Sequence, residues 1–128
     1  NQRNPVWSEN FYKAISNSSM AVNINRGKSK KYSSSNRIGS LMGNGLLTFM
    51  DNEKQFDHFF NKNEMIFFDN NQDLSEKLSF YKKNTSIQKK IAFNGQKKYF
   101  KLFNCVDVAK YIIEKSMNPN GNYKPTWE

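Results

Sequence analysis

The chain has very little cysteine or histidine. Its 128 residues contain one of each, Cys105 and His58, which excludes an internal disulfide and leaves no set of Cys and His at metal-ligand spacing. We therefore expect no bound metal. Helical spacing in "LFNCVDVAKYII" predicts a partly buried Cys105, and we expect both side chains to serve packing.

Long apolar runs are also missing. No segment approaches the roughly 20 apolar residues of a transmembrane helix, and no basic-then-apolar signal peptide opens the chain. We therefore expect a cytoplasmic protein without a membrane span. The first residue is Asn rather than Met, and we expect the chain to be a piece of a longer protein.

Acidic residues are scarce: 11 Asp and Glu stand against 20 Lys and Arg, for a net charge of +9. Residues 1–50 are basic, the segment 51–76 is acidic, and the last third is rich in lysine. This balance indicates an anionic partner such as nucleic acid, a membrane surface or a phosphorylated small molecule. The late lysine pairs are typical of solvated helix faces, whereas the charges from Arg26 to Arg37 lie among Gly and Ser.

Helices and strands are predicted to alternate along the chain, which is long enough for one domain with a real core. Leu46–Met50 has the pattern of a strand buried on both faces, Gly45 is placed to end the preceding helix in a left-handed conformation, and Asn71 or Asp73 is predicted to cap a later helix. The expected strands are 20–25, 46–50 and 64–69, and the expected helices are 7–19, 36–43, 52–60, 71–84, 86–104 and 106–117.

This order predicts an α/β fold: a partial Rossmann-like, three-layer domain with a small three-stranded parallel sheet, helices on both faces and C-terminal helices. The domain would span residues 1–117, and residues 118–128 would form an extended C-terminal tail. A small parallel sheet leaves edge strands unpaired, so we expect self-association, as a dimer, through the 20–25 strand or exposed apolar helix faces.

The segment "KYSSSNRIGSLMGNGLLTF" joins serines and an arginine to a helix start and then to an apolar strand. A helix N-terminus offers N–H groups and partial positive charge, which suit a phosphate. Guanidinium groups can pair with phosphate oxygens, glycine allows close backbone approach, and serines can donate hydrogen bonds. The residues in these positions are Arg26, Gly27, Ser34, Ser35 and Arg37.

The motifs "RIGSLMGNGLLTF", "EMIFFDNNQDLSEKLSFY" and "IAFNGQKKYF" follow one another in a familiar order. Together they resemble the C-terminal, donor-binding domain of GT-B glycosyltransferases, in particular the spore-maturation-type family, over about residues 20–117. The resemblance implies that a nucleotide-diphosphate sugar binds as a substrate and that no cofactor is needed. It places the diphosphate near the Arg26–Arg37 loop and the ribose near Ser40, where related enzymes usually have a glutamate.

The resemblance also implies that catalysis needs an N-terminal acceptor domain, so the isolated chain is expected to be inactive. No general base is identified, because His58 lies in an aromatic-rich segment away from the proposed phosphate loop. Two alternatives are a small basic nucleic-acid-binding module and a generic interaction domain. Aromatic residues at core-like spacing, rather than interleaved with basic residues, disfavour nucleic acid.

Overall fold

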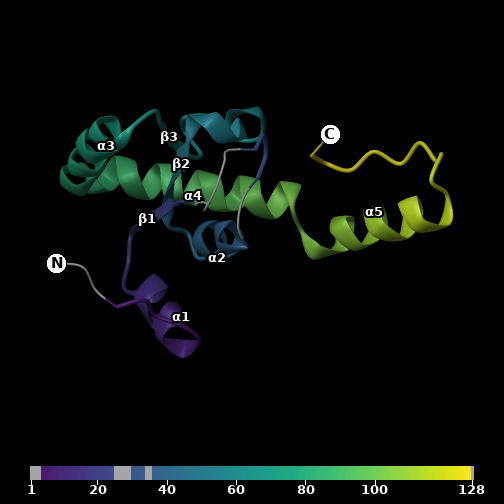
Figure 1. The fold of residues 1–128 in the computed structure, drawn as a ribbon, viewed down its shortest axis with the longest axis horizontal. Coiled ribbons are helices and arrows are strands. Elements are labelled where there is room, and N and C mark those ends of the chain that lie inside the picture. The colour runs from purple at the N-terminus through teal and green to yellow at the C-terminus, as the bar shows by residue number, and fades with distance from the viewer. Residues whose placement is uncertain (1–3, 25–29, 34–35, 128) are drawn as a thin grey trace.

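Three short parallel strands form the centre of the protein (Figure 1). The computed structural model describes residues 4–24, 30–33 and 36–127. Phe49 of the middle strand pairs in register with Val22 on one side and Ile66 on the other. This confirms the predicted small parallel sheet. The strands, in their spatial order, are β1 (Met20–Asn23), β2 (Leu47–Asp51) and β3 (Ile66–Phe68).

The described part of the chain also forms five α-helices and two short 3₁₀ turns. None of the helices described there is both long and apolar enough to cross a membrane. The helices are α1 (Glu9–Ser16), α2 (Arg37–Gly43), α3 (Asn71–Lys83), α4 (Thr85–Leu102) and α5 (Cys105–Met117), and the 3₁₀ turns are η1 (Asn52–Lys54) and η2 (Phe56–His58).

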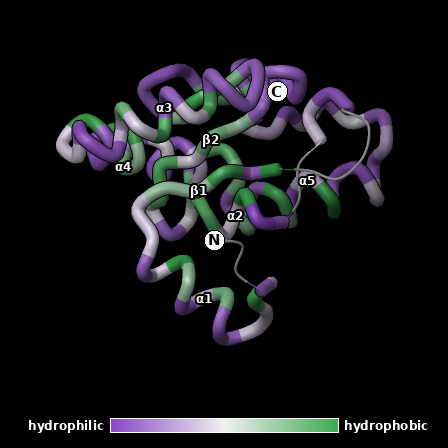
Figure 2. The backbone as a smooth tube through the Cα atoms, turned by 60° about the vertical axis from the view of Figure 1, so that its left-hand side comes forward, coloured by the Kyte–Doolittle hydropathy of each residue, from purple (hydrophilic) through white to green (hydrophobic). Residues whose placement is uncertain are grey.

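Strand β2 is buried on both faces, as its apolar run predicts, and Leu47 to Met50 are at most 1% exposed. Leu47 and Phe49 pack on one side against α3 and α4, whereas Met50 packs on the other side against Met42 of α2. Helices therefore cover both faces of the sheet, which confirms the three-layer, partial Rossmann-like α/β fold. Figure 2 shows the hydrophobic stretch along the strands enclosed by more polar helices.

The turn between α2 and β2 follows the conformation expected from its glycine. Gly45 has a φ of 73°. Its N–H donates to the carbonyl of Met42 at 3.0 Å, and the N–H of Leu46 donates to the carbonyl of Leu41 at 3.1 Å. This pair of bonds closes the helix C-terminus in a Schellman motif, which directs the chain straight into the buried strand.

The segment 52–60 differs from the single helix predicted for it. The Asp51 carboxylate accepts a hydrogen bond from the N–H of Glu53 at 2.8 Å, which starts the 3₁₀ turn η1. Gln55 then takes a left-handed φ of 55°, which separates η1 from η2. The predicted apolar side is still formed, since Phe56 and Phe60 are buried.

Two further predictions are wrong, one about the cap of a helix and one about the burial of a side chain. Helix α3 is capped by Asn70, whose side chain accepts from the N–H groups of Gln72 and Asp73, and not by Asn71 or Asp73. Cys105 is exposed rather than partly buried. It opens α5, which projects beyond the end of the sheet in Figure 1, so the apolar spacing around it does not face the core.

The C-terminal segment folds back along α5 without forming a further helix or strand in its described residues. The Trp127 ring stacks on Phe103 at 6.0 Å between ring centroids and meets Tyr111 edge-on at 5.6 Å. The Thr126 hydroxyl donates to the carbonyl of Leu102 at 2.9 Å. These contacts dock the tail on the junction between α4 and α5.

Candidate functional site

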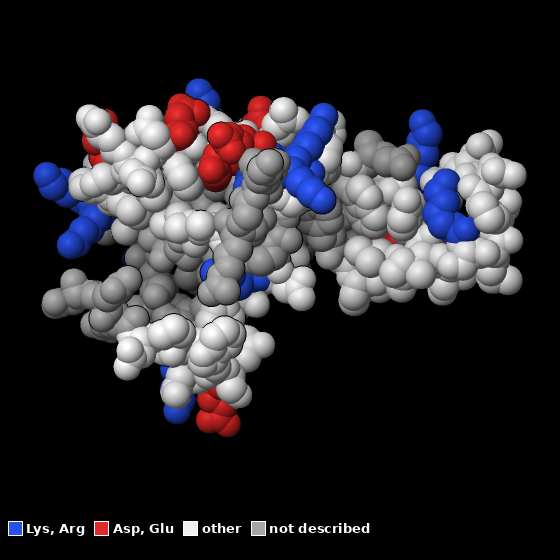
Figure 3. All heavy atoms as spheres, viewed as in Figure 1, with Lys and Arg blue, Asp and Glu red and all other residues white. Residues whose placement is uncertain are grey.

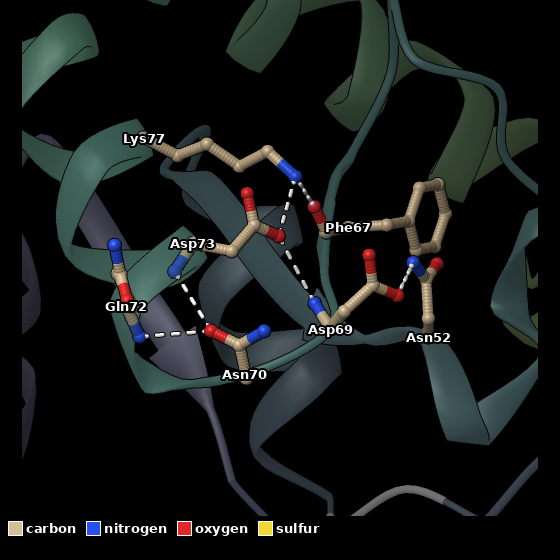
Figure 4. A network of polar contacts seen from close by, with 7 residues as sticks. All are labelled: Asn52, Phe67, Asp69, Asn70, Gln72, Asp73 and Lys77. Carbon is tan, nitrogen blue, oxygen red and sulfur yellow. Dashed lines mark hydrogen bonds and ion pairs between the residues drawn. The ribbon is translucent and has the colours of Figure 1, made fainter.

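The carboxyl ends of the three strands gather polar residues at one edge of the sheet. Asn23 and Asp51 end β1 and β2, and Asp69 follows β3 directly. Ligands of open parallel sheets bind outside this edge, because the connections that leave it supply loops and helix N-termini. The side-chain amide of Asn52 donates to Asp69 at 2.6 Å and so ties the end of β2 to the end of β3 (Figure 4).

A hollow of about 580 Å³ opens beside this edge. Its wall includes the phenol of Tyr32, whose ring lies 5.4 Å from the His58 ring and 5.0 Å from the Phe59 ring. His58 is exposed here, although the sequence suggested a packing role. The lining residues are Tyr32, Asn52, Gln55, Asp57 and His58.

Asn52 and Asp57 also border a second hollow, of about 450 Å³, that reaches Asp69 and Lys77. In Figure 3 several acidic side chains lie close together at the upper left of the view, with basic side chains beside them. Within the described residues, no group of three or more His, Cys, Asp and Glu side chains is arranged to hold a metal ion.

Arg37 is the first residue of α2, at the end of the connection that follows β1. One guanidinium nitrogen, Nη2, donates to the carbonyl of Ile24 at 2.8 Å, which holds the guanidinium at the carboxyl end of β1. Asn36, which precedes α2, makes no side-chain capping bond. Ser40 follows Arg37 by one helical turn, so both residues lie on the same side of α2.

The structure therefore brings together two of the predicted donor-binding residues, Arg37 and Ser40. The remaining predicted residues, Arg26, Gly27, Ser34 and Ser35, lie outside the described residues.

The sequence analysis did not identify the polar residues after β2 and β3 as part of the site. Part of the signal was present: the predicted strand 64–69 ends at Asp69, and Asn52 follows the predicted strand 46–50 by two positions, whereas in the structure both residues directly follow a strand. Tyr32 had no such signal, because its contact with His58 joins segments far apart in the sequence.

The first turn of α3 forms a polar network next to the second hollow, shown in Figure 4. The Asp73 carboxylate accepts from the Lys77 ammonium at 2.7 Å and from the N–H of Asp69 at 3.0 Å. Lys77 also donates to the carbonyl of Phe67 at 2.7 Å. First the Lys77 hydrogen bond and then the Asp69 N–H lower the pKa of Asp73 below its ordinary value of 3.8. The network anchors α3 to β3.

Because its pKa is lowered in the folded state, Asp73 stabilises the fold above pH 3.8, and this contribution is lost as the pH falls through the folded-state pKa. We expect Asp73→Asn to be less stable than wild type at pH 6 and the difference to shrink towards pH 3. Urea unfolding at several pH values measures this. Glu76→Gln is the matched control, because it also removes one negative charge from α3 but leaves the Asp73–Lys77 ion pair in place. If the free energies of unfolding of wild type and Asp73→Asn differed by the same amount at every pH, the ionised Asp73 would not be the source of this stabilisation.

One comparison with known proteins gives a match. A family model described as glycosyl transferase-like matches residues 1–114. The searches of curated proteins and of solved structures gave no match.

Proposed function

The chain belongs to the glycosyl transferase-like family, and we propose that it forms the donor-binding part of a GT-B glycosyltransferase. The ligand would be the nucleotide-diphosphate sugar, bound as a substrate at the carboxyl edge of the sheet. The family match over residues 1–114 supports a sugar-transfer role, and the parallel sheet supplies the edge at which such folds bind ligands.

The position of Arg37 is the observation that carries the proposal. Its hydrogen bond to the Ile24 carbonyl keeps a guanidinium beside the start of α2, where the chain leaves β1. Guanidinium groups match phosphate oxygens in charge and geometry, and α2 directs its N-terminal partial positive charge to the same place.

The other predicted residues complete the proposed binding set. Ser40, one turn beyond Arg37, would bond to a ribose hydroxyl with a single hydroxyl group in place of a carboxylate. Diphosphate contacts are proposed for the connection between β1 and α2. The residues proposed there are Arg26, Gly27, Ser34 and Ser35.

Charge stabilisation would be the chemical contribution of this part of the enzyme. During transfer the sugar–oxygen bond breaks and the nucleoside diphosphate leaves with negative charge, which fixed cations and backbone N–H groups stabilise. The acceptor would come from an N-terminal partner domain across an interdomain cleft. We therefore expect the isolated chain to bind donor and to transfer no sugar.

Replacing Arg37 should weaken nucleotide binding. Loss of a charge-assisted contact of about 1.5–3 kcal/mol corresponds to a Kd about 10- to 100-fold higher for Arg37→Ala. Arg37→Lys should fall between wild type and Arg37→Ala, because lysine keeps the charge and loses the planar fork. Calorimetric titration with uridine and guanosine diphosphates, free and sugar-linked, measures these constants.

Lys90→Ala is a matched control, since it removes one exposed positive charge from α4, away from the carboxyl edge. Thermal unfolding of each variant separates loss of binding from loss of the Arg37–Ile24 hydrogen bond. Equal affinities for wild type and a folded Arg37→Ala would overturn the proposed site, and absence of nucleotide binding by wild type would overturn the donor-binding function.

A further inference from the structure

Lys54 is a buried lysine at the carboxyl edge of the sheet. It is the last residue of η1, three positions after the end of β2, and only 5% of it is exposed. Lysine is rarely buried to this degree without a partner, because removing an ammonium group from water is unfavourable unless another charge or acceptor replaces the water. Its environment therefore calls for an explanation.

Within the described residues, the Lys54 amine makes no hydrogen bond or ion pair, and the ion pair found there joins Lys77 to Asp73. No polar side-chain atom in the same residues is both fully enclosed and unpartnered. The amine of Lys54 must therefore reach a small opening while its stem stays covered. An ammonium group in such a position has no partner within the described residues, so it can bind an anion that comes from solution.

The backbone around Lys54 is held in uncommon conformations. The carbonyl of Lys54 accepts a hydrogen bond from the N–H of Tyr32 at 2.9 Å. Tyr32 has a φ of 57° and the adjoining Gln55 a φ of 55°; Ser8 is the remaining described non-glycine residue with positive φ. Such conformations are unfavourable for residues with a side chain and cluster at ligand-binding positions.

The bond to Tyr32 joins the backbone of Lys54 to the connection between β1 and α2, the same connection that ends at Arg37. We propose that the Lys54 ammonium binds the diphosphate of the nucleotide donor, as a second cation beside Arg37. This inference rests on the proposed function and adds a residue that the sequence pattern did not suggest. The first residue of α2 would bring the guanidinium, and the turn after β2 would bring the ammonium.

A purely structural lysine and an anion-binding lysine respond differently to Lys54→Met. Methionine keeps the apolar stem and removes the charge, so the fold loses little packing and no longer has to hold an unpaired cation at a largely covered position. We expect the melting temperature to be unchanged or raised. A structural role predicts unaltered anion affinity, whereas the proposed role predicts a weaker one.

The experiment is calorimetric titration of the full chain with inorganic pyrophosphate and with uridine diphosphate. We expect Lys54→Met to raise the Kd for pyrophosphate about 10-fold or more, because a charge-assisted contact is lost. Lys62→Met is the matched control, since Lys62 is exposed and borders the neighbouring 450 Å³ hollow. Its Kd should stay within about twofold of wild type.

Chemical labelling of the wild-type protein gives a readout that needs no variant to fold. With limiting acetic anhydride, bound pyrophosphate should slow acetylation of Lys54 and leave Lys62 unchanged, as peptide mass spectrometry would show. Equal labelling of Lys54 with and without saturating pyrophosphate would overturn the proposal.

The outcomes separate this inference from the proposed function. Normal pyrophosphate affinity in Lys54→Met, together with weakened binding in Arg37→Ala, would remove Lys54 from the site and keep the donor function. Lys54-dependent binding of pyrophosphate without binding of any nucleoside diphosphate would keep the ammonium site and reject the nucleotide donor. A wild-type chain that binds neither probe would overturn both.

Discussion

Gly95→Ala is expected to destabilise the fold by about 3 kcal/mol, the upper part of the range for overpacked cores. A Cβ atom at this position would lie 2.1 Å from the backbone carbonyl oxygen of Glu64 and 3.1 Å from the terminal methyl of Met42. A backbone atom cannot rotate away as a side chain can, so α4 must move off the segment that leads into β3. The higher helix propensity of alanine offsets only about 1 kcal/mol.

Urea unfolding of wild type and Gly95→Ala measures this difference. Gly43→Ala is the matched control, because its added Cβ would meet nothing nearer than the Phe100 ring at 3.9 Å and its φ is not positive. We expect that variant to be as stable as wild type or slightly more stable. A Gly95→Ala protein of wild-type stability would mean that α4 and the Glu64 segment are not in contact.

Features set by local chemistry are those that the sequence predicts well. The run Leu46–Met50 is apolar apart from Thr48, and in the structure both faces of the strand are covered. Gly45 follows a short amphipathic helix, and it adopts the left-handed conformation that ends one. In both cases the residues that decide the conformation lie within a few positions of each other.

The segment 52–60 shows where local pattern is insufficient. Phenylalanines at 56, 59 and 60 fit a helix, and Phe56 and Phe60 are indeed buried. The conformation is decided instead by the Asp51 carboxylate, which captures the Glu53 N–H, and by the left-handed Gln55. Competition between a side-chain acceptor and the helix backbone is hard to judge from spacing alone.

Helix α5 shows a different limit. Its apolar spacing predicted burial, yet Ile112 and Ile113 are 58% and 57% exposed, and Cys105 is exposed too. An amphipathic pattern indicates that a face can be buried but does not identify what covers it. The predicted dimer stays a prediction for the same reason, although β1 does lie at an edge of the sheet, as expected.

Sequence spacing was sufficient to predict which candidate site residues share a helix. Arg37 and Ser40 are one turn apart in any helix that starts near residue 36, and the structure keeps them together on α2. Lys54 was not predictable, because nothing in its local sequence indicates that a lysine there is 5% exposed, or that its carbonyl accepts a hydrogen bond from Tyr32 in another connection. Tertiary contacts of this kind leave no periodic signal in the sequence.

Phe49→Ala is expected to cost about 3–5 kcal/mol, which is a large share of the roughly 5–15 kcal/mol that stabilises a small domain. Phe49 has no exposed surface, stands at the centre of β2 and meets the Tyr81 ring edge-on at 6.0 Å. Its removal would leave a cavity between the sheet and α3. Denaturant unfolding measures the loss, and Phe93→Ala, at a residue 57% exposed, makes the same chemical change on the surface of α4.

We expect the Phe93→Ala loss to be about 1 kcal/mol or less, because a half-exposed ring buries far less area. A similar loss in both variants would mean that β2 is not the centre of the core. Phe49→Ala also tests how the site depends on the fold. Its nucleotide affinity, measured under conditions where it remains folded, should equal that of wild type, because Phe49 faces α3 and α4 rather than the carboxyl edge. Arg37→Ala should show the reverse, with nucleotide binding weakened and the fold kept. The two variants together distinguish a residue that holds the sheet together from one that acts at its edge.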